Sequence, residues 1–258
     1  MKVALFCGGL GTRLRDYSDT VPKPLVNIGN RPIIWHLMKY YSHFGHHDFV
    51  LCLGYMGIMI KEYFLKYEEW VSNDFVLSNK GKDVELFNRD IDEWKISFLE
   101  TGANSNIGTR LKKVQSYLQN EDIFMANYSD GLSNVPLDDY LEKFIKDDVV
   151  ASFVAVRPSS SFHAVSTDKN GLVTDINNLS KSELWLNGGF FIFRKEIFDY
   201  MNEGEELVEQ PFQRLIKEKL LMSYRHDGFW KAMDTYKDKI EFEKMYTDGN
   251  RLWEMWNK

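Results

Sequence analysis

Several features are scarce in this sequence, and each scarcity excludes a class of protein. Only two cysteines, Cys7 and Cys52, occur in 258 residues. A disulfide-stabilised secreted scaffold is therefore excluded, and both cysteines are expected to be buried free thiols of a cytoplasmic protein. There is no long basic run and the net charge is −6, which argues against nucleic acid as a partner. No apolar stretch approaches the length of a membrane span, and glycines interrupt the short N-terminal apolar run before it could serve as a signal peptide. We therefore expect neither a membrane nor a nucleic-acid partner.

The order of the apolar patterns indicates an α/β fold. Hydrophobic residues make up 44% of the chain, and its length suits one large domain. Lys2–Phe6 and Phe49–Leu53 are short apolar runs typical of buried strands, whereas Pro32–Phe44 and Ile58–Tyr67 carry apolar residues at helical spacing. Strands that alternate with helices predict parallel strands joined by right-handed crossovers. We therefore predict a Rossmann-like sheet, mixed but mainly parallel and flanked by helices, with ligands beyond the carboxyl ends of its strands.

The rest of the chain continues this pattern. The polar segment 69–90 predicts loops and a short hairpin, and Asp168–Gly171 predicts the turn of a second hairpin. The four histidines between residues 36 and 47 fit no metal-binding spacing and are expected in the core or in solvent. Further strands are expected at 94–100, 123–126, 149–156, 162–165, 185–193 and 221–225, and further helices at 137–145, 196–201, 211–219 and 237–256. Segment 104–117 is expected to run through a turn at 108–110 into a helix.

The first strand ends in a glycine-rich loop, Cys7-Gly-Gly-Leu-Gly-Thr-Arg-Leu14. Backbone N–H groups in such a loop can face a phosphate without interference from side chains. Leu14 stands where a dinucleotide fingerprint has its third glycine, and no Gly-Lys-Ser/Thr follows as in a P-loop. Pro22 and Pro24 enclose Lys23 and keep the backbone extended there. Together with Arg13, this lysine brackets the loop with positive charge, which predicts a cradle for a triphosphate.

These motifs resemble those of a known family. The run from Gly8 to Leu14, followed by Pro-Lys-Pro-Leu, is similar to the signature of sugar-1-phosphate nucleotidyltransferases, and the resemblance extends to about Trp256. A later segment, Thr101-Gly followed by Gly108-x-Arg-Leu-Lys-Lys, is similar to the glucose-1-phosphate cytidylyltransferase branch. The resemblance implies a sheet of the nucleotide-diphospho-sugar transferase type. It also implies transfer of a cytidylyl group from CTP to a sugar 1-phosphate, with glucose 1-phosphate the first candidate, giving CDP-sugar and pyrophosphate.

The resemblance also implies roles for individual residues. Arg13 and Lys23 are the implied catalytic residues. Arg110 could instead be an arginine at a helix start in solvent, but the match favours contact with nucleotide phosphates or ribose. The residues implied in nucleotide binding are Phe6, Gly8, Gly9, Leu10, Gly11, Thr12, Thr101, Arg110 and Ser129.

Two aspartates are implied metal ligands. Asp130 follows a predicted strand and precedes Gly131, so it could be an ordinary turn residue, and Asp234 could be the N-cap of a helix. Carboxylates bind Mg²⁺ jointly with phosphates, and both positions match metal ligands of the family. We therefore expect Mg²⁺ as a cofactor, held by Asp130 and Asp234.

The acceptor side departs from the family pattern. Relatives carry Glu-Lys-Pro near Leu179, whereas here Lys181 either stands in for the missing lysine or is a loop residue without a role. Asn187 and Gly188 match sugar-contacting positions, although a glycine pair is equally suited to a β-bulge. The acceptor could therefore be another hexose phosphate, a polyol phosphate or an amino-alcohol phosphate.

The organisation predicted is a single domain over residues 1–258. An acceptor-binding half spans about 150–230, and a helical tail rich in aromatic residues spans about 235–258. That tail could cover the core or a partner subunit in a homo-oligomer. Two other functions agree less well with these residues. A catalytically inactive sugar-nucleotide-binding protein would need a broken catalytic set, and a dinucleotide-binding oxidoreductase would need the third glycine.

Overall fold

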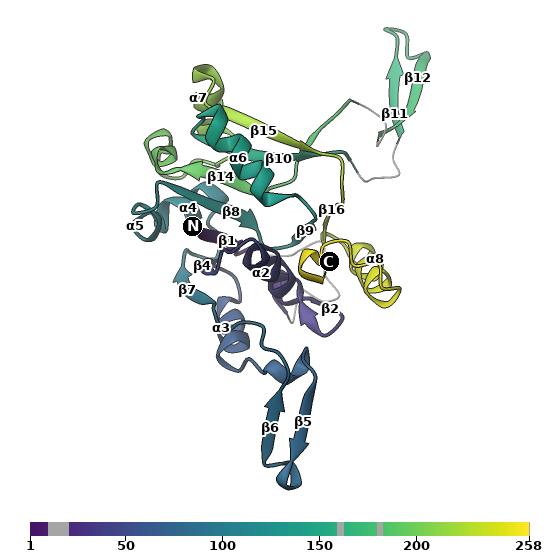
Figure 1. The fold of residues 1–258 in the computed structure, drawn as a ribbon. Coiled ribbons are helices and arrows are strands. Elements are labelled where there is room, and N and C mark those ends of the chain that lie inside the picture. The colour runs from purple at the N-terminus through teal and green to yellow at the C-terminus, as the bar shows by residue number, and fades with distance from the viewer. Residues whose placement is uncertain (10–20, 159–162, 180–182, 258) are drawn as a thin grey trace.

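The parallel half of the central sheet is built around the first strand. The computed structural model describes residues 1–9, 21–158, 163–179 and 183–257. Strand β1 (Lys2–Cys7) lies between β4 (Asp48–Leu53) and β8 (Ile123–Tyr128) and is parallel to both. Strand β7 (Lys95–Glu100) extends the sheet beyond β4, again in parallel. After β1, the chain first adds β4 and β7 on one side of this strand and then adds β8 on its other side (Figure 1). The strand order therefore reverses at β1, between its neighbours β4 and β8.

The second half of the sheet mixes strand directions. Strand β14 (Phe191–Arg194) is antiparallel to β8, and β10 (Ala151–Val156) is antiparallel to β14. Strand β15 (Leu221–His226) is parallel to β10, and the short β13 (Leu186–Asn187) pairs with the end of β10. The prediction of a mixed, mainly parallel sheet is confirmed.

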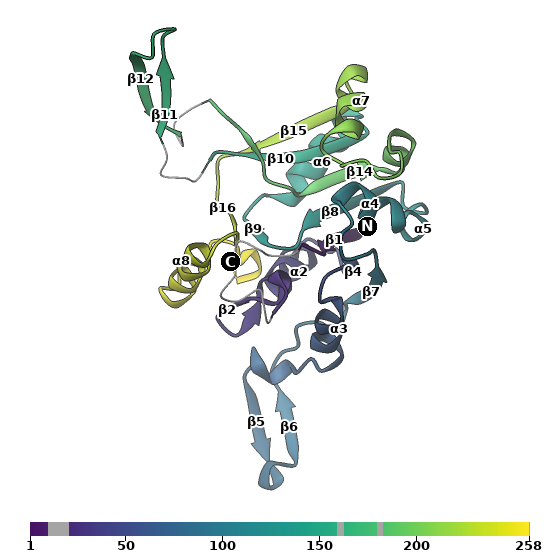
Figure 2. The ribbon, with the colours of Figure 1, turned by 180° about the vertical axis from the view of Figure 1, so that it is seen from behind.

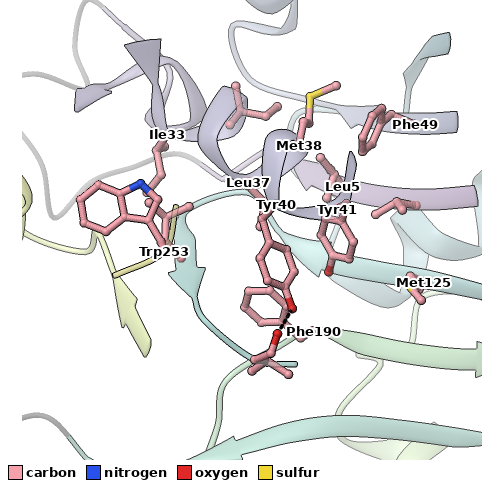
Figure 3. Packing of buried hydrophobic residues seen from close by; sticks show 14 of the residues in the cluster. Leu5, Ile33, Leu37, Met38, Tyr40, Tyr41, Phe49, Met125, Phe190 and Trp253 are labelled. Carbon is pink, nitrogen blue, oxygen red and sulfur yellow. Dashed lines mark hydrogen bonds between the residues drawn. The ribbon is translucent and has the colours of Figure 1, made fainter. Parts of the chain in front are cut away.

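Both faces of the sheet are buried, as the continuous apolar strands predict. Successive residues of β1 point to opposite faces, so Leu5 packs in one core and Phe6 in the other. The first core is covered by α2 (Ile33–His43) and α6 (Leu137–Asp147). Figure 3 shows the close packing there, where the Tyr40 hydroxyl donates to the carbonyl oxygen of Val135 at 2.7 Å. The second core is covered by α4 (Ile107–Lys113), α5 (Gln115–Leu118), α7 (Gln210–Glu218) and the 3₁₀ segment η6 (Lys195–Tyr200).

Two hairpins project from the body in opposite directions (Figures 1 and 2). One consists of β5 (Phe75–Ser78) and β6 (Asp83–Leu86), and it confirms the hairpin predicted in segment 69–90. The other consists of β11 (His163–Thr167) and β12 (Val173–Asn178). Its predicted turn is confirmed, because the Asp168 carboxylate accepts from the backbone N–H of Leu172 at 2.9 Å. The smaller elements are η2 (Lys23–Leu25), β2 (Asn27–Ile28), β3 (Arg31–Pro32), α3 (Gly57–Leu65), η3 (Glu69–Val71), η4 (Asn79–Gly81), β9 (Gly131–Ser133) and β16 (Trp230–Ala232).

The C-terminal tail packs on the protein's own core. Helix α8 (Tyr236–Thr247) ends well before residue 256, so the prediction of a helix over 237–256 is wrong in its second half. Gly249, at φ 75°, turns the chain after the helix, and η7 (Met255–Asn257) follows. Trp253 is fully buried, and its indole N–H donates to the Nδ1 atom of His36 at 3.3 Å. The aromatic tail therefore closes the core on one side of α2.

His36 and His46 are buried and His43 is exposed, which agrees with the expected positions of these histidines in the core or in solvent. Within the described ranges, His, Cys, Asp and Glu side chains form no group of three or more that could hold a metal ion. Within the same ranges, no helix has both the length and the apolar character needed to cross a membrane.

Candidate active site

The candidate site lies at the carboxyl ends of β1 and β8. This is the point where the strand order reverses, which is where α/β sheets bind ligands. Gly8 and Gly9 follow β1, and Ser129 follows β8. The Ser129 hydroxyl donates to the carbonyl oxygen of Phe6 at 2.8 Å and so ties the two strand ends together. Burial raises the pKa of the neighbouring Cys7 to about 12, so its thiol is not a nucleophile here.

A lysine and two aspartates meet beside these strand ends. The ammonium nitrogen of Lys23 lies 2.5 Å from Oδ2 of Asp130 and 2.7 Å from Oδ1 of Asp234. Pro22 has an extended backbone, with φ −64° and ψ 144°, but Lys23 is the first residue of the 3₁₀ segment η2, so the prediction of an extended backbone at this lysine is wrong. Burial lowers the pKa of Lys23, but the Asp130 and Asp234 carboxylates raise it, and the net direction is upward. The lysine is therefore a fixed cation at the centre of the site.

The two aspartates are aligned by a short strand pair. Strand β9 begins directly after Asp130 and is antiparallel to β16, with Gly131 opposite Ala232. The backbone N–H of Met233 also donates to the carbonyl oxygen of Asp130 at 2.8 Å. These contacts bring two carboxylates from distant parts of the chain to the same lysine.

The alternative structural role proposed for Asp234 is wrong. The residue that caps α8 is Thr235, whose side chain accepts from the backbone N–H of Asp238 while the Asp238 carboxylate accepts from Thr235. This reciprocal arrangement is a capping box. It leaves the Asp234 carboxylate free of the capping role and directed to Lys23.

The donor set fits a divalent metal ion. Asp130 and Asp234 present hard oxygen atoms to one cation, here the Lys23 ammonium group, so they can converge on a single charge. Among the residues that the structure describes, no third carboxylate or imidazole joins them. The remaining ligands of a bound ion would be phosphate oxygens and water, as is usual for Mg²⁺.

A bulge in the sheet forms the opposite wall of the site. Ser152 of β10 pairs with Ile192, whereas Ala155 pairs with Asn187. Ser152 and Ala155 are three residues apart, but their partners are five residues apart, so the facing segment contains two extra residues. The predicted strand over 185–193 is thus broken into β13 and β14, and the two extra residues are accommodated around Gly188 and Gly189. Gly189 has a φ of 76°, which favours glycine. The β-bulge interpretation of the glycine pair is confirmed, and sugar contact stays a prediction.

Two residues that sequence reasoning missed hold this bulge. Asn127 is buried, and its Oδ1 atom accepts from the backbone N–H of Phe190 at 2.9 Å. Trp230 donates from its indole N–H to the carbonyl oxygen of Gly188 at 2.8 Å. A polar residue inside an apolar strand is a signal for Asn127, whereas nothing in the local sequence marks Trp230.

A cavity of about 340 Å³ lies between the charged centre and this wall. This volume falls at the lower end of the range for small-molecule sites. The cavity is lined by Lys23, Asn127, Tyr128, Asp130, Gly131, Asn187, Gly188, Trp230, Ala232 and Asp234. The structure therefore brings together Lys23, both predicted metal ligands and the predicted acceptor residues Asn187 and Gly188.

Arg110 is buried in the structure rather than exposed at a helix start. Its guanidinium donates to the carbonyl oxygens of Gly8 at 2.9 Å and Leu53 at 3.2 Å, and to the Thr101 hydroxyl at 2.7 Å. Arg110 therefore links the carboxyl ends of β1, β4 and β7. The alternative that it is a solvent-exposed arginine at a helix start is wrong. Its predicted contact with nucleotide phosphates or ribose stays a prediction. The predicted residues Leu10, Gly11, Thr12, Arg13 and Lys181 lie outside the described residues.

A larger cavity of about 920 Å³ lies at the base of the β5–β6 hairpin. Several of its charged groups contact one another. Arg31 and Lys39 both approach the Asp90 carboxylate, which also accepts from the Asn73 amide at 2.9 Å. This network anchors the hairpin, and the cavity holds none of the residues of the candidate site.

Known proteins resemble this chain over its whole length. A family model described as "Nucleotidyl transferase" matches residues 2–249. A protein of Bacillus subtilis (strain 168) named "Probable glucose-1-phosphate cytidylyltransferase" is 36% identical over 258 residues, covering 99% of this chain and 100% of the relative. The glucose-1-phosphate cytidylyltransferase of Salmonella typhimurium is 33% identical with the same coverage. Among solved structures, a UDP-glucose pyrophosphorylase complexed with UDP-glucose has a TM-score of 0.69 at 15% identity, covering 96% of this chain and 98% of that one, which shows a shared fold.

Proposed function

The chain belongs to the nucleotidyl transferase family, and from this premise we propose that it transfers a cytidylyl group from CTP to a sugar 1-phosphate. Glucose 1-phosphate is the first candidate acceptor, because two relatives of full length carry the name of that activity. The products would be CDP-sugar and pyrophosphate. The observation that carries the proposal is the meeting of Lys23, Asp130 and Asp234 at the strand-order reversal.

The reaction joins two polyanions, so charge and position matter more than proton transfer. An acceptor phosphate oxygen attacks the α-phosphorus of CTP, and the bond from that phosphorus to the β-phosphate oxygen breaks. The acceptor phosphate is already ionised and needs no general base. Transfers of this kind depend mainly on positioning and on stabilisation of charge. Lys23 would orient phosphate oxygens at the reacting centre, while Arg13 and the loop amides from Gly8 to Thr12 would neutralise the triphosphate and the leaving pyrophosphate.

The metal proposed is Mg²⁺, held by Asp130 and Asp234. A bound Mg²⁺ would supply charge neutralisation and a template for the incoming phosphates. Lys23 contacts the same two carboxylates, so it would share them with the ion and orient the phosphate oxygens beside it.

An assay of pyrophosphate release tests the proposal. The protein is incubated with Mg²⁺, glucose 1-phosphate and one nucleotide at a time: CTP, UTP, ATP, GTP or dTTP. We expect release with CTP alone. Release with another nucleotide would contradict the choice of base, and no release with any nucleotide and any phosphorylated acceptor would contradict the enzyme function.

A second candidate keeps CTP and changes the acceptor. It is favoured by the absence of the Glu-Lys-Pro expected near Leu179. Other hexose phosphates, polyol phosphates and amino-alcohol phosphates then belong in the same assay. We propose that the half of the chain up to about residue 149 binds the nucleotide and that residues 150–230 bind the acceptor.

We also propose that the protein forms a homo-oligomer in the cytoplasm. The β11–β12 hairpin exposes Val165, Val173 and Ile176 by more than half, and the β5–β6 hairpin exposes Leu77 and Val84 to a similar degree. Such apolar surface is commonly covered by a partner. Light scattering coupled to size exclusion tests this, and a mass of 30.3 kDa would contradict it. The two buried free thiols suit a reducing compartment.

A further inference from the structure

We propose that Arg157 and Arg225, which lie against the ring of Trp185, bind a second anionic group of the acceptor. The preferred acceptor would then be a phosphate ester that carries a carboxylate or a second phosphate at the end remote from the reacting phosphate. This inference rests on the proposed function. It places a doubly anionic phosphate ester ahead of glucose 1-phosphate, the first candidate acceptor named above.

Both guanidinium groups are held by the same indole. The central guanidinium carbon of Arg157 lies 4.2 Å from the ring centroid of Trp185, and that of Arg225 lies 5.2 Å away. Attraction between a cation and an aromatic face reduces the number of orientations each arginine adopts. A guanidinium placed against a ring still presents its N–H groups at its edge, where a planar or tetrahedral anion can accept two of them.

The register of the sheet places this pair next to the acceptor wall. Asn187 of β13 pairs with Ala155 of β10, and Ala155 pairs on its other side with Arg225 of β15. Side chains of directly paired residues project from the same face of a sheet. Asn187, which lines the cavity, and Arg225 therefore share a face, two strand spacings or about 10 Å apart.

Trp185 directly precedes β13 and lies two residues before Asn187. Its contacts with Arg157, which follows β10, and with Arg225 of β15 place its ring at the carboxyl ends of these two strands. Two residues of extended chain span about 7 Å. The arginine pair thus lies beyond Asn187 on the side of the wall away from Lys23 and Asp130.

The charge of the cluster is net positive. Nε of Arg157 lies 3.3 Å from Oδ1 of Asp227, whose side chain is 74% exposed. An ion pair this exposed contributes little and is readily exchanged for another anion. Among the described residues, no carboxylate forms an ion pair with Arg225. One full positive charge is therefore available beside the acceptor wall.

The position of this charge selects the remote end of the acceptor. The reacting phosphate must lie at Lys23 and the two aspartates, and the body of the acceptor must lie against Asn187 and Trp230. A group that reaches Arg225 is then the part of the acceptor farthest from the reaction. Glucose 1-phosphate presents only hydroxyl groups there, whereas a carboxylate or phosphate would make charge-assisted hydrogen bonds.

The test compares three acceptors that differ at the remote end: glucose 1-phosphate, glucuronic acid 1-phosphate and glucose 1,6-bisphosphate. Calorimetry measures the binding of each to the full-length protein with Mg²⁺ and a non-hydrolysable CTP analogue, and kcat/KM with CTP is measured in parallel. We expect at least one anionic acceptor to bind about 10- to 100-fold more tightly than glucose 1-phosphate, which is the contribution of a hydrogen bond to a charged group. The two anionic acceptors distinguish a carboxylate site from a phosphate site.

Variants connect that preference to the cluster. Arg225→Gln should remove most of the preference while leaving binding of glucose 1-phosphate unchanged, and Trp185→Leu should weaken it by releasing both arginines. Arg89→Gln is the matched control, because this arginine is 63% exposed at the β5–β6 hairpin and lies outside the candidate site. It should retain the full preference.

The outcomes separate the two proposals. Equal binding of all three acceptors, no binding of any, or an unchanged preference in Arg225→Gln overturns the arginine site. A preference that Arg225→Gln abolishes, with no cytidylyl transfer to any acceptor, supports the arginine site and contradicts the proposed enzyme function instead.

Discussion

The Lys23 ammonium nitrogen lies 2.7 Å from Oδ1 of Asp234, although 211 residues separate the two in the chain. The same nitrogen contacts Asp130 at 2.5 Å, so one cation offsets the repulsion between two carboxylates. The proposed metal ion would contact the same pair of acidic groups as this lysine, so the two cations are expected to compete for them.

Lys23→Met should make the protein more dependent on Mg²⁺ for its stability. Without the lysine, the carboxylates of Asp130 and Asp234 face each other with no cation between them. We expect a lower Tm than wild type without metal and a larger rise in Tm when Mg²⁺ is added, measured by thermal unfolding. Lys23→Arg is the control that keeps the charge. An equal metal-induced rise in Lys23→Met and wild type would contradict the competition.

Arg13→Ala should abolish most turnover and leave the fold intact. The reason is the motif, in which this arginine follows the glycine loop and is expected to neutralise the triphosphate. Removal of one preorganised group that stabilises charge costs on the order of 100- to 1000-fold in rate. Pyrophosphate release measures the loss, and circular dichroism checks the fold. Full activity in this variant would remove Arg13 from the proposed mechanism.

Asp130→Asn should weaken metal binding without changing the size of the side chain. An amide supplies one neutral oxygen in place of a charged carboxylate, which hard cations bind more weakly. Calorimetric titration with Mn²⁺ should show at least about a ten-fold rise in Kd, roughly the contribution of one charged interaction. Asp227→Asn, at an exposed carboxylate outside the cavity, is the control. An unchanged titration in Asp130→Asn would place the metal elsewhere.

Arg110→Met should lower the free energy of unfolding and also raise the KM for CTP. Arg110 is 2% exposed, and its loss leaves the carbonyl oxygen of Gly8 without this donor, whereas the carbonyl oxygen of Leu53 keeps the backbone N–H and hydroxyl of Thr101 as donors. Each buried group left unsatisfied costs about 1–3 kcal/mol, and urea unfolding measures the sum. A variant with wild-type stability and wild-type KM would show that the hydrogen bonds of Arg110 contribute neither to the fold nor to the position of the glycine-rich loop.

Stability should fall in mild acid because His36 is buried in its neutral form. Burial lowers the pKa of His36 to about 4 from 6.5, and its Nε2 and Nδ1 atoms contact Ile28 and Trp253. As pH falls below 6.5, the unfolded chain binds the proton first, so stability is complete above that pH and is lost between 6.5 and 4. At pH 5 the loss should be about 2 kcal/mol.

Urea unfolding at pH 7.5 and pH 5 measures this loss. His36→Gln should be less sensitive to pH than wild type, whereas the exposed His43 provides a control in His43→Gln. His46 is also buried and its pKa is lowered, so it adds to the dependence of stability on pH in wild type and in both variants. Identical slopes in wild type and His36→Gln would contradict the assignment to His36.

The parallel half of the fold was predictable because each of its strands is a continuous apolar run. The break in the strand over 185–193 was not predictable, because the bulge is defined by register against β10 and not by its own residues. The termination of α8 at Thr247 was missed for a similar reason. Aromatic spacing continues past Gly249, but Trp253 turns inward to the core instead of extending a helix.

The candidate site was predictable where a short motif carries the residue, as for Lys23, Asp130 and Asn187. It was not predictable where strand pairing creates the contact. Trp230 reaches Gly188 only because β16 pairs with β9. Arg157 directly follows β10, and β10 pairs with β13 on one side and with β15, the strand of Arg225, on the other. The two arginines meet at Trp185 through this pairing, so neither arginine stands out in the sequence.

The pairing of β9 with β16 also has a consequence for synthesis of the protein. Asp130 and Asp234 are aligned by a strand that begins at Trp230. A nascent polypeptide synthesised only as far as Asp130 carries the glycine loop but lacks Asp234, the second carboxylate of the proposed metal pair. The proposed pair therefore forms only after the strand that begins at Trp230 has left the ribosome.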